Sequence, residues 1–187
     1  MYSFILIISI SLVIGLNLIF NFTWMTLLDL FIAFAIILLP SLFCAIGIRL
    51  LPKRWFDGEA KVYNVSVGET NFLNKIKVKS WKDKIPNIAK IKFKNLPTNI
   101  DPKDPNFVKK LISESCYAES LHISCIFTAL IALLCIIKTR WFLTMGLPIA
   151  IVYTIFNIPS ILVQRFNRPR LKKQLQLLEK QLQKSTY

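Results

Sequence analysis

Two carboxylates and the only histidine of the chain lie together in the segment ESCYAESLH, at residues 114–122. Imidazole is the side chain whose ordinary pKa lies closest to neutrality, so His122 could accept a proton from a substrate hydroxyl. Glu119 precedes His122 by three residues and would share its face of a helix, where a carboxylate can orient the ring. From the residues alone, a purely structural histidine is the favoured interpretation, and general-base catalysis by His122 with Glu119 is the alternative.

A long apolar run, residues 123–137, directly follows this segment. Asp104 can cap a helix that has Pro105 in its first turn, and no helix breaker follows before Ile137. One helix of about 50 Å would therefore run through the segment, at about 1.5 Å per residue. Because its second half matches the thickness of a bilayer, the segment is expected where the helix enters the membrane, at the depth of lipid headgroups.

The composition indicates a membrane protein, since 54% of the 187 residues are hydrophobic. Four runs approach the length of about 20 residues that a spanning helix needs, namely 2–20, 26–51, 122–137 and 141–163. We therefore predict an all-α membrane protein, with four transmembrane helices in a single integral membrane domain of residues 1–187. The first run lacks a preceding basic segment and a small-residue cleavage site, so we interpret it as an anchor rather than a removed signal peptide.

Basic residues are concentrated between the second and third runs and after the fourth. Since Lys and Arg accumulate on the cytoplasmic side, we expect a basic cytoplasmic lobe at 52–121, a cytoplasmic tail at 164–187 and both termini in the cytoplasm. The net charge of +14 could also indicate nucleic-acid binding. Basic residues beside apolar spans are explained more simply by topology and anionic lipid, so no nucleic-acid partner is expected.

Inside the lobe, residues 75–79 and 91–94 alternate between basic and apolar side chains as strands do. Between them lies WKDKIP, at residues 81–86, where Trp81, Lys82 and Asp83 fit a membrane interface. An anchoring turn and a substrate loop both remain open for this segment. The four cysteines show no C-x-x-C pair, so we expect no disulfide and no metal site, and we interpret Cys116 as an incidental cysteine rather than a nucleophile.

A polar stripe marks the fourth apolar run, because Tyr153, Asn157, Ser160 and Gln164 recur at helical spacing. Polar groups inside a membrane face protein or substrate, so the stripe is either a seam between helices or part of a binding site. Pro159 lies inside this run and is expected to interrupt the helix.

An arginine cluster follows the stripe, with Arg165, Arg168 and Arg170 in the segment QRFNRPRL. Arginine can grip phosphate with two hydrogen bonds, whereas a topology signal alone would work equally well with lysine. Leucines then recur from Leu171 to Leu182 on one side of the tail, which predicts an amphipathic C-terminal helix on the inner leaflet or against the lobe.

Three separated blocks of the chain resemble the glycosyl-4,4'-diaponeurosporenoate acyltransferase family of Gram-positive bacteria, small membrane proteins of staphyloxanthin-type carotenoid synthesis. The blocks are WKDKIP at 81–86, ESCYAESLH at 114–122 and NIPSILVQRFNRPRL at 157–171, and their order and intervals also agree. The third block is the most specific, since it keeps residue types and spacing. The resemblance implies a multi-pass protein of the bacterial cell membrane. It covers the chain from about Phe72 to the tail.

The resemblance implies a catalytic group and a substrate-binding group. The catalytic group is His122, Glu119 and Glu114. The substrate-binding group is Trp81, Lys82, Asp83, Asn157, Gln164, Arg165, Asn167, Arg168 and Arg170. This chain departs from the usual family pattern at Tyr117, Ile123 and Phe166, where the family has arginine, tryptophan and tyrosine.

The implied reaction moves a fatty acyl chain from a thioester, either acyl-CoA or an acyl-carrier thioester, to a hydroxyl of a glycosylated lipid, without a bound cofactor. His122 would be the base, Glu119 would orient its ring, and Arg165, Arg168 and Lys82 would hold donor phosphates. The main alternative is a non-enzymatic membrane protein, an immunity or accessory subunit, that binds a lipid or a partner helix. A membrane reductase or methyltransferase ranks lowest, because no glycine-rich dinucleotide turn is present.

Overall fold

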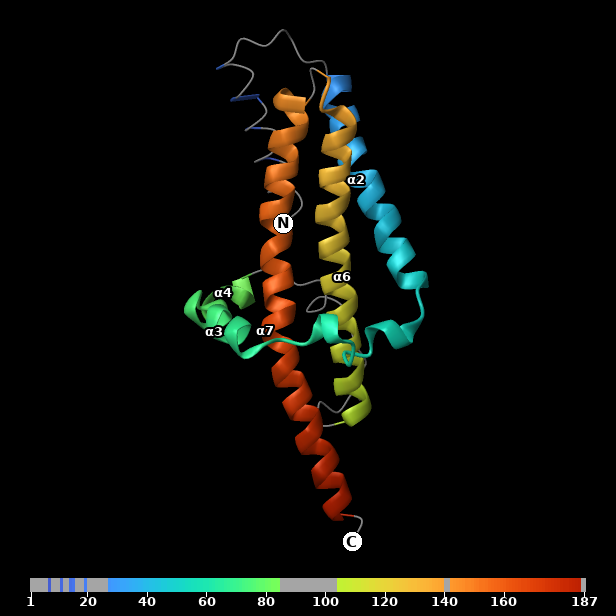
Figure 1. The fold of residues 1–187 in the computed structure, drawn as a ribbon, viewed down its shortest axis with the longest axis vertical. Helices are drawn as coiled ribbons and strands as arrows, with labels where there is room; N and C mark the ends of the chain where they lie inside the picture. The colour runs from blue at the N-terminus through green and yellow to red at the C-terminus, as the bar shows by residue number, and fades with distance from the viewer. Residues whose placement is uncertain are drawn as a thin grey trace. The chain divides into compact units, whose positions relative to one another are not determined.

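The computed structural model describes residues 27–84, 104–139 and 142–185, together with Ile7, Ser11, Ile14, Gly15 and Ile19. Within these residues every regular element is a helix (Figure 1). The chain divides into two compact units. The first contains Met1–Leu50 and Leu121–Ile158, and the second contains Leu51–Ser120 and Pro159–Tyr187.

The first unit contains α2 (Leu27–Leu50), the later part of α6 (Pro105–Ile136), the π-helix η4 (Phe142–Gly146) and the beginning of α7 (Leu147–Ser185). Its core consists of buried residues from α6, η4 and α7, among them Ala129, Met145 and Ile149. Small side chains such as Ala129 allow helices to approach closely without a large apolar residue between them.

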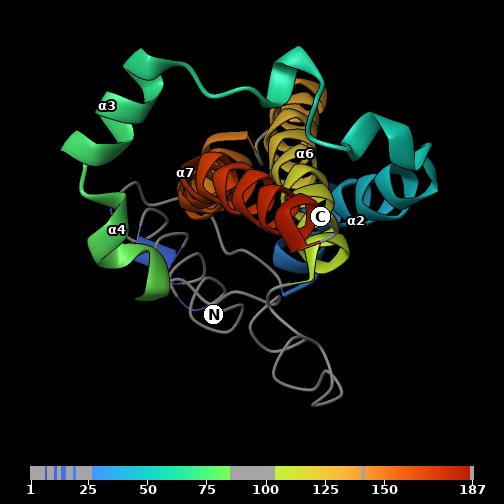
Figure 2. The same ribbon diagram turned by 90° about the horizontal axis from the view of Figure 1, so that it is seen from below.

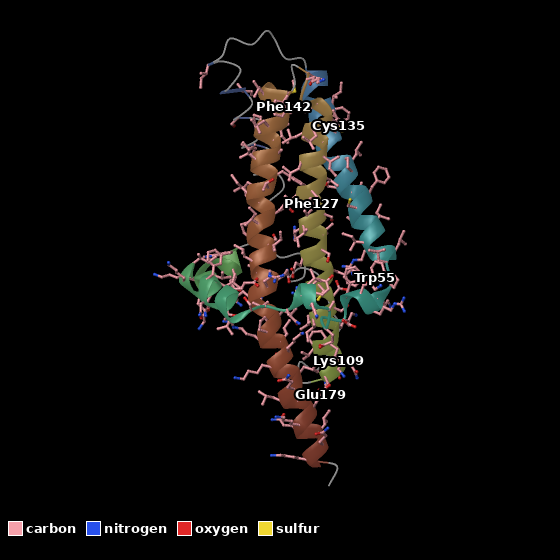
Figure 3. All side chains as sticks on the ribbon, viewed as in Figure 1. Trp55, Lys109, Phe127, Cys135, Phe142 and Glu179 are labelled. Carbon is pink, nitrogen blue, oxygen red and sulfur yellow. The ribbon has the colours of Figure 1, made fainter. Side chains whose placement is uncertain are left out.

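The outer surface of the first unit is apolar. Phe43 of α2 is 71% exposed and Ile155 of α7 is 57% exposed. Phe127 of α6 is 62% exposed (Figure 3). Both α6 and α7 are long and apolar enough to cross a membrane. Exposed side chains of this kind suit a surface that faces lipid. The predicted span at 122–137 falls on α6, and the described part of the span at 141–163 falls on η4 and α7. The helix α2 occupies most of the predicted 26–51 run, and most of the first run lies outside the described residues.

The second unit contains short helices packed on parts of α6 and α7. They are η1 (Lys53–Phe56), η2 (Lys61–Tyr63), α3 (Val67–Lys75), α4 (Val78–Trp81) and η3 (Lys82–Lys84). Phe56 of η1 stacks on Tyr117 of α6, with ring centroids 3.9 Å apart. Leu73 of α3 packs in one buried cluster with Phe166 of α7, and Figure 2 shows α3 and α4 beside α7.

Local sequence signals explain two of the helix starts. Asp104 accepts a hydrogen bond from the backbone N–H of Asn106 at 2.9 Å, which confirms the predicted cap of α6. Ser66 caps α3 by accepting from the backbone N–H of Glu69 at 3.1 Å. Gly58 has φ +88°, and a Cβ added there would lie 2.5 Å from Cγ2 of Ile112, so only glycine fits this approach of the lobe to α6.

The predicted strand at 75–79 is wrong. Lys75 ends α3, Lys77 has a left-handed backbone with φ 52°, and Val78 begins α4. Trp81 donates from Nε1 to the carbonyl of Ile76 at 3.0 Å and so supports the turn between the two helices. An alternation over five residues is too short to exclude two short helices joined by a turn. The second predicted strand, at 91–94, lies outside the described residues, as do Ile85 and Pro86.

The predicted break between the fourth span and a separate tail helix is also wrong, because α7 continues through Pro159 and Pro169. A proline removes one backbone hydrogen bond, and packing can offset that loss. Buried side chains lie close to both prolines, with Val163 6% exposed and Phe166 3% exposed between them.

Candidate active site

His122 of α6 is hydrogen-bonded to Asn157 of α7 in the first unit. Its Nδ1 lies 2.8 Å from Oδ1 of Asn157, and Asn157 is only 8% exposed. The amide nitrogen of Asn157 donates to the carbonyl of Tyr153 at 2.8 Å. A carbonyl can only accept, so the amide NH2 must face Tyr153 and the amide oxygen must face the ring.

This arrangement determines the tautomer of His122. Since Oδ1 of Asn157 is an acceptor, Nδ1 of the ring carries the hydrogen and donates it. In the neutral ring, Nε2 then has the free lone pair. A histidine held in this tautomer is prepared to accept a proton at Nε2, which is what a general base requires.

Glu119 has a different environment, in the second unit. It is 1% exposed, and its two carboxylate oxygens accept from two arginines of α7. Arg165 donates from Nη1 to Oε1 at 2.5 Å, and Arg168 donates from Nη2 to Oε2. Arg165 also forms a two-pronged ion pair with Glu69 of α3. Two carboxylates and two guanidinium groups thus form one charge-balanced network.

Arg168 is as enclosed as Glu119, at 1% exposed. Besides Glu119 it donates to the carbonyl of Tyr63 at 3.0 Å and to the carbonyl and hydroxyl of Ser115, each at 3.3 Å. Its guanidinium also lies 5.0 Å from the ring centroid of Tyr63. Tyr63 in turn shares a hydrogen bond of 2.8 Å with the hydroxyl of Ser120. Arg168 therefore ties η2 to both long helices.

These contacts bear on two roles expected from the sequence, and both roles stay predictions. In the first unit the ring of His122 is hydrogen-bonded to the amide of Asn157, and in the second unit the oxygens of Glu119 accept from two arginines. Arg168 is enclosed and donates to protein groups, while its Nε has no hydrogen-bond partner in the described part of the chain. The guanidinium of Arg165 is likewise engaged by Glu69, Glu119 and the carbonyls of Val62 and Asn64.

The other candidate residues lie mainly around Phe166 in the second unit. The ring of Trp81 packs against the buried cluster that contains Phe166. Nζ of Lys82 donates to Oδ1 of Asn167 at 3.4 Å and lies 5.9 Å from the ring centroid of Phe166. Cζ of Arg170 lies 3.5 Å from the same ring centroid. Glu114 and Gln164 are half-buried and Asp83 is exposed.

The positions where this chain departs from the family pattern are partly explained by packing. Tyr117 is 7% exposed and stacks on Phe56, while Phe166 of α7 is 3% exposed and packs with Leu73. Ile123 is half-buried on α6.

The ionisation of two groups outside the spans follows from their neighbours. The hydrogen bond from Arg165 holds the pKa of Glu69 below its usual range. Burial raises the pKa of the Cys116 thiol to about 11, so the thiol stays protonated near neutral pH. This supports the interpretation of Cys116 as an incidental cysteine rather than a nucleophile.

Sequence reasoning missed Glu69 as a partner of the arginine cluster. The pattern Ser66-x-x-Glu69 is typical of a helix start, which could have located α3. It carries no information about a partner on α7, 96 residues away in the sequence.

A protein-family model matches the chain. The model of the glycosyl-4,4'-diaponeurosporenoate acyltransferase family matches residues 52–177, a range that contains the His122 pair and the arginine network. No curated protein and no solved structure matches the chain. Because the family model covers more than half of the chain, the resemblance of the three sequence blocks is confirmed, and the protein is an acyltransferase that belongs to the glycosyl-4,4'-diaponeurosporenoate acyltransferase family.

Proposed function

We propose that this protein moves a fatty acyl chain from a thioester to a hydroxyl group of a glycosylated membrane lipid, with His122 as the base. The observation that carries the proposal is the hydrogen bond between His122 and Asn157, since it leaves Nε2 as the acceptor. The family name supports a glycosylated carotenoid-like acceptor, and so a role in carotenoid biosynthesis.

In the proposed reaction, the sugar hydroxyl oxygen attacks the thioester carbonyl while its proton passes to Nε2 of His122. A C–O bond forms and the carbonyl oxygen becomes an oxyanion. When the tetrahedral intermediate collapses, the C–S bond breaks and the imidazolium returns the proton to the leaving thiolate. The products are an ester and a thiol, and no acyl-enzyme is required.

The position of His122 along the chain suits such an acceptor. It directly precedes the apolar run of α6, whose side chains include Phe127 at 62% exposed and Leu134 at 67% exposed. A sugar headgroup lies at the boundary between lipid and water, where this helix is proposed to enter the membrane. Water-soluble thioester donors would approach from the cytoplasmic side.

The function can be tested by comparing lipid extracts of cells that express the protein with extracts of cells that express His122→Ala. Mass spectrometry should find a glycolipid heavier by one fatty acyl group only with the wild-type protein. The purified wild-type protein should form the same product from an acyl thioester and the glycolipid. Identical lipid profiles and no product from the purified protein would contradict the proposed reaction.

The orientation with both termini and the lobe in the cytoplasm follows from the charge asymmetry. In a variant without the four native cysteines, a single cysteine at position 68 or 185 should be shielded from an impermeant thiol reagent in intact cells. Both should react after the membrane is opened. Labelling of either from outside would overturn the orientation and separate the lobe from cytoplasmic thioesters.

A further inference from the structure

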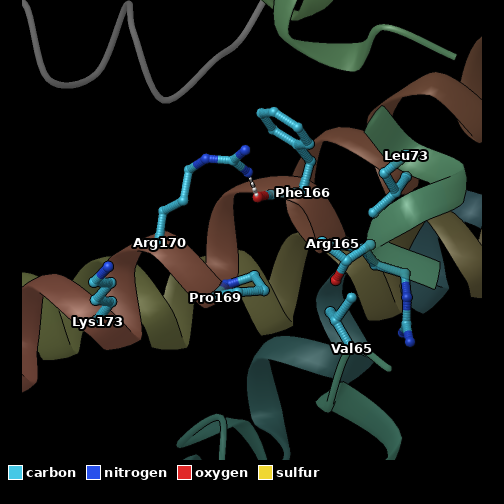
Figure 4. A pocket seen from close by; sticks show the side chains of 8 residues that line it. Val65, Leu73, Arg165, Phe166, Pro169, Arg170 and Lys173 are labelled. Atoms are coloured by element: carbon cyan, nitrogen blue, oxygen red, sulfur yellow. Dashed lines mark hydrogen bonds between the residues drawn. The ribbon is translucent and has the colours of Figure 1, made fainter. Parts of the chain in front are cut away.

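A small cavity of about 250 Å³ lies against α7 in the second unit (Figure 4). Its apolar walls come from Val65, Leu73, Phe166 and Pro169. Arg170 and Lys173 also line it, and both are exposed side chains of α7. The cavity therefore combines an apolar interior with two cations that water can reach.

The third cation at the cavity, Arg165, is already engaged. Its guanidinium pairs with Glu69 and Glu119, which neutralise it together with Arg168. In the part of the chain that the structure describes, Arg170 and Lys173 have no carboxylate within 4.0 Å. These two side chains thus supply the charge that a bound anion would meet.

Contacts with Phe166 hold the guanidinium of Arg170 in a position where it can bind an anion. Its guanidinium lies over the ring of Phe166 at 3.5 Å, and Nη1 donates to the carbonyl of Phe166 (Figure 4). A guanidinium has five N–H donors, so several remain for a ligand. Because its position is already fixed, less side-chain entropy is lost when it binds, and its planar fork suits two oxygens of one phosphate.

The size of the cavity limits what it can hold. Pockets for whole small ligands usually measure about 300–1,000 Å³, so this cavity suits one part of a longer molecule. The matching chemistry is a phosphate ester that continues into an uncharged arm, with the phosphate at Arg170 and Lys173 and the arm against Val65 and Leu73. A phosphopantetheine thioester and a phospholipid headgroup both have this chemistry.

We propose that the cavity binds the phosphate and the adjoining arm of a phosphopantetheine thioester, and so anchors the acyl donor. This proposal rests on the proposed function for the nature of the donor. It places donor recognition on Arg170 and Lys173 rather than on the arginines of the buried network.

Binding of 4'-phosphopantetheine and of pantetheine to the purified protein in detergent isolates the contribution of the phosphate. Calorimetry should show at least about tenfold tighter binding of the phosphorylated compound, the effect of about 1.4 kcal/mol that one charge-assisted contact can supply. The variant Arg170→Gln/Lys173→Gln should lose this difference. The control Lys180→Gln/Lys184→Gln, with the same charge change farther along α7, should keep it. Equal affinities in the wild type, no binding of either compound, or an unaffected Arg170/Lys173 variant would overturn the proposal.

A second experiment distinguishes a phosphopantetheine thioester from a phospholipid headgroup as the ligand of the cavity. In nanodiscs of phosphatidylcholine, phosphopantetheine should bind as it does in detergent, and added phosphatidylglycerol should not displace it. Displacement that depends on Arg170 and Lys173 would make the cavity a lipid site and overturn the assignment to the donor. Because binding is measured without turnover, a protein that binds the probe here but transfers no acyl chain would contradict the proposed function and leave the site intact.

Discussion

Replacing His122 by alanine should lower acyl transfer by a factor of about a hundred or more, the usual contribution of a positioned general base. The protein should still insert at normal levels, since the change removes one side chain from a long helix. Initial rates of acyl transfer by purified protein, corrected for the amount of folded enzyme, measure the effect. A matched control is Ser124→Ala on the same helix, which should keep its activity, since the Ser124 hydroxyl donates to the carbonyl of Leu121 in its own helix.

Replacing Asn157 tests whether its amide orients the ring of His122. Leucine at this position has a similar size but offers no acceptor to Nδ1, so the ring loses both its orientation and its preferred tautomer. We expect Asn157→Leu to lose most of the activity. The double variant His122→Ala/Asn157→Leu should then be no worse than His122→Ala alone, because groups that act as a unit are strongly non-additive.

Two results would contradict this account of the base. Normal products from purified His122→Ala would make the histidine a packing residue at the edge of the membrane. Losses that multiply in the double variant would show that Asn157 acts separately from the ring, for example by binding substrate directly, as the family resemblance implies.

The elements that position His122 could be predicted because their signals are local. Asp104 and Pro105 give the start of α6, and the apolar run after His122 gives its continuation. Asn157 was predicted as a site residue, but its role was not, since a polar stripe on a helix does not reveal which neighbour it faces. The pairing with His122 depends on how α6 and α7 pack.

The lobe was harder to predict because its structure depends on contacts between distant parts of the chain. The alternation at 75–79 favoured a strand, whereas packing of Leu73 and Val78 against α7 produces two helices. The arginines were assigned to phosphate from their number and spacing. A buried arginine needs a carboxylate partner, and Glu119, in the neighbouring motif, could have been considered as that partner before any ligand.

The second large effect is expected when the buried network loses one charge. Within the described residues, Glu119→Gln leaves the two guanidinium groups with Glu69 alone to neutralise them, and Arg168 is 1% exposed. Removing one partner of a buried ion pair typically costs about 3–5 kcal/mol. We therefore expect a large fall in the thermal stability of the purified protein. The change in tryptophan fluorescence on heating, or the rate of protease cleavage of the lobe, measures it.

The exposed ion pair between Lys109 and Glu179, 2.9 Å apart in the same unit, provides the control (Figure 3). Its side chains are 57% and 43% exposed, so Lys109→Gln should cost less than about 1 kcal/mol. Comparing the stabilities of the two variants distinguishes the cost of leaving a buried charge unpaired from the cost of losing an exposed ion pair.

A compensating change tests the network more strictly than either single variant. In Glu119→Gln/Arg168→Met, the remaining Arg165 and Glu69 still neutralise each other, and the enclosed position of Arg168 receives an apolar side chain of similar length. The double variant should therefore be more stable than Glu119→Gln alone, because replacing both members of a buried pair costs much less than removing one. If Glu119→Gln instead kept the stability of the wild type and lost only acyl transfer, Glu119 would act on the reaction itself, and its charge would not be what holds the lobe to α6 and α7.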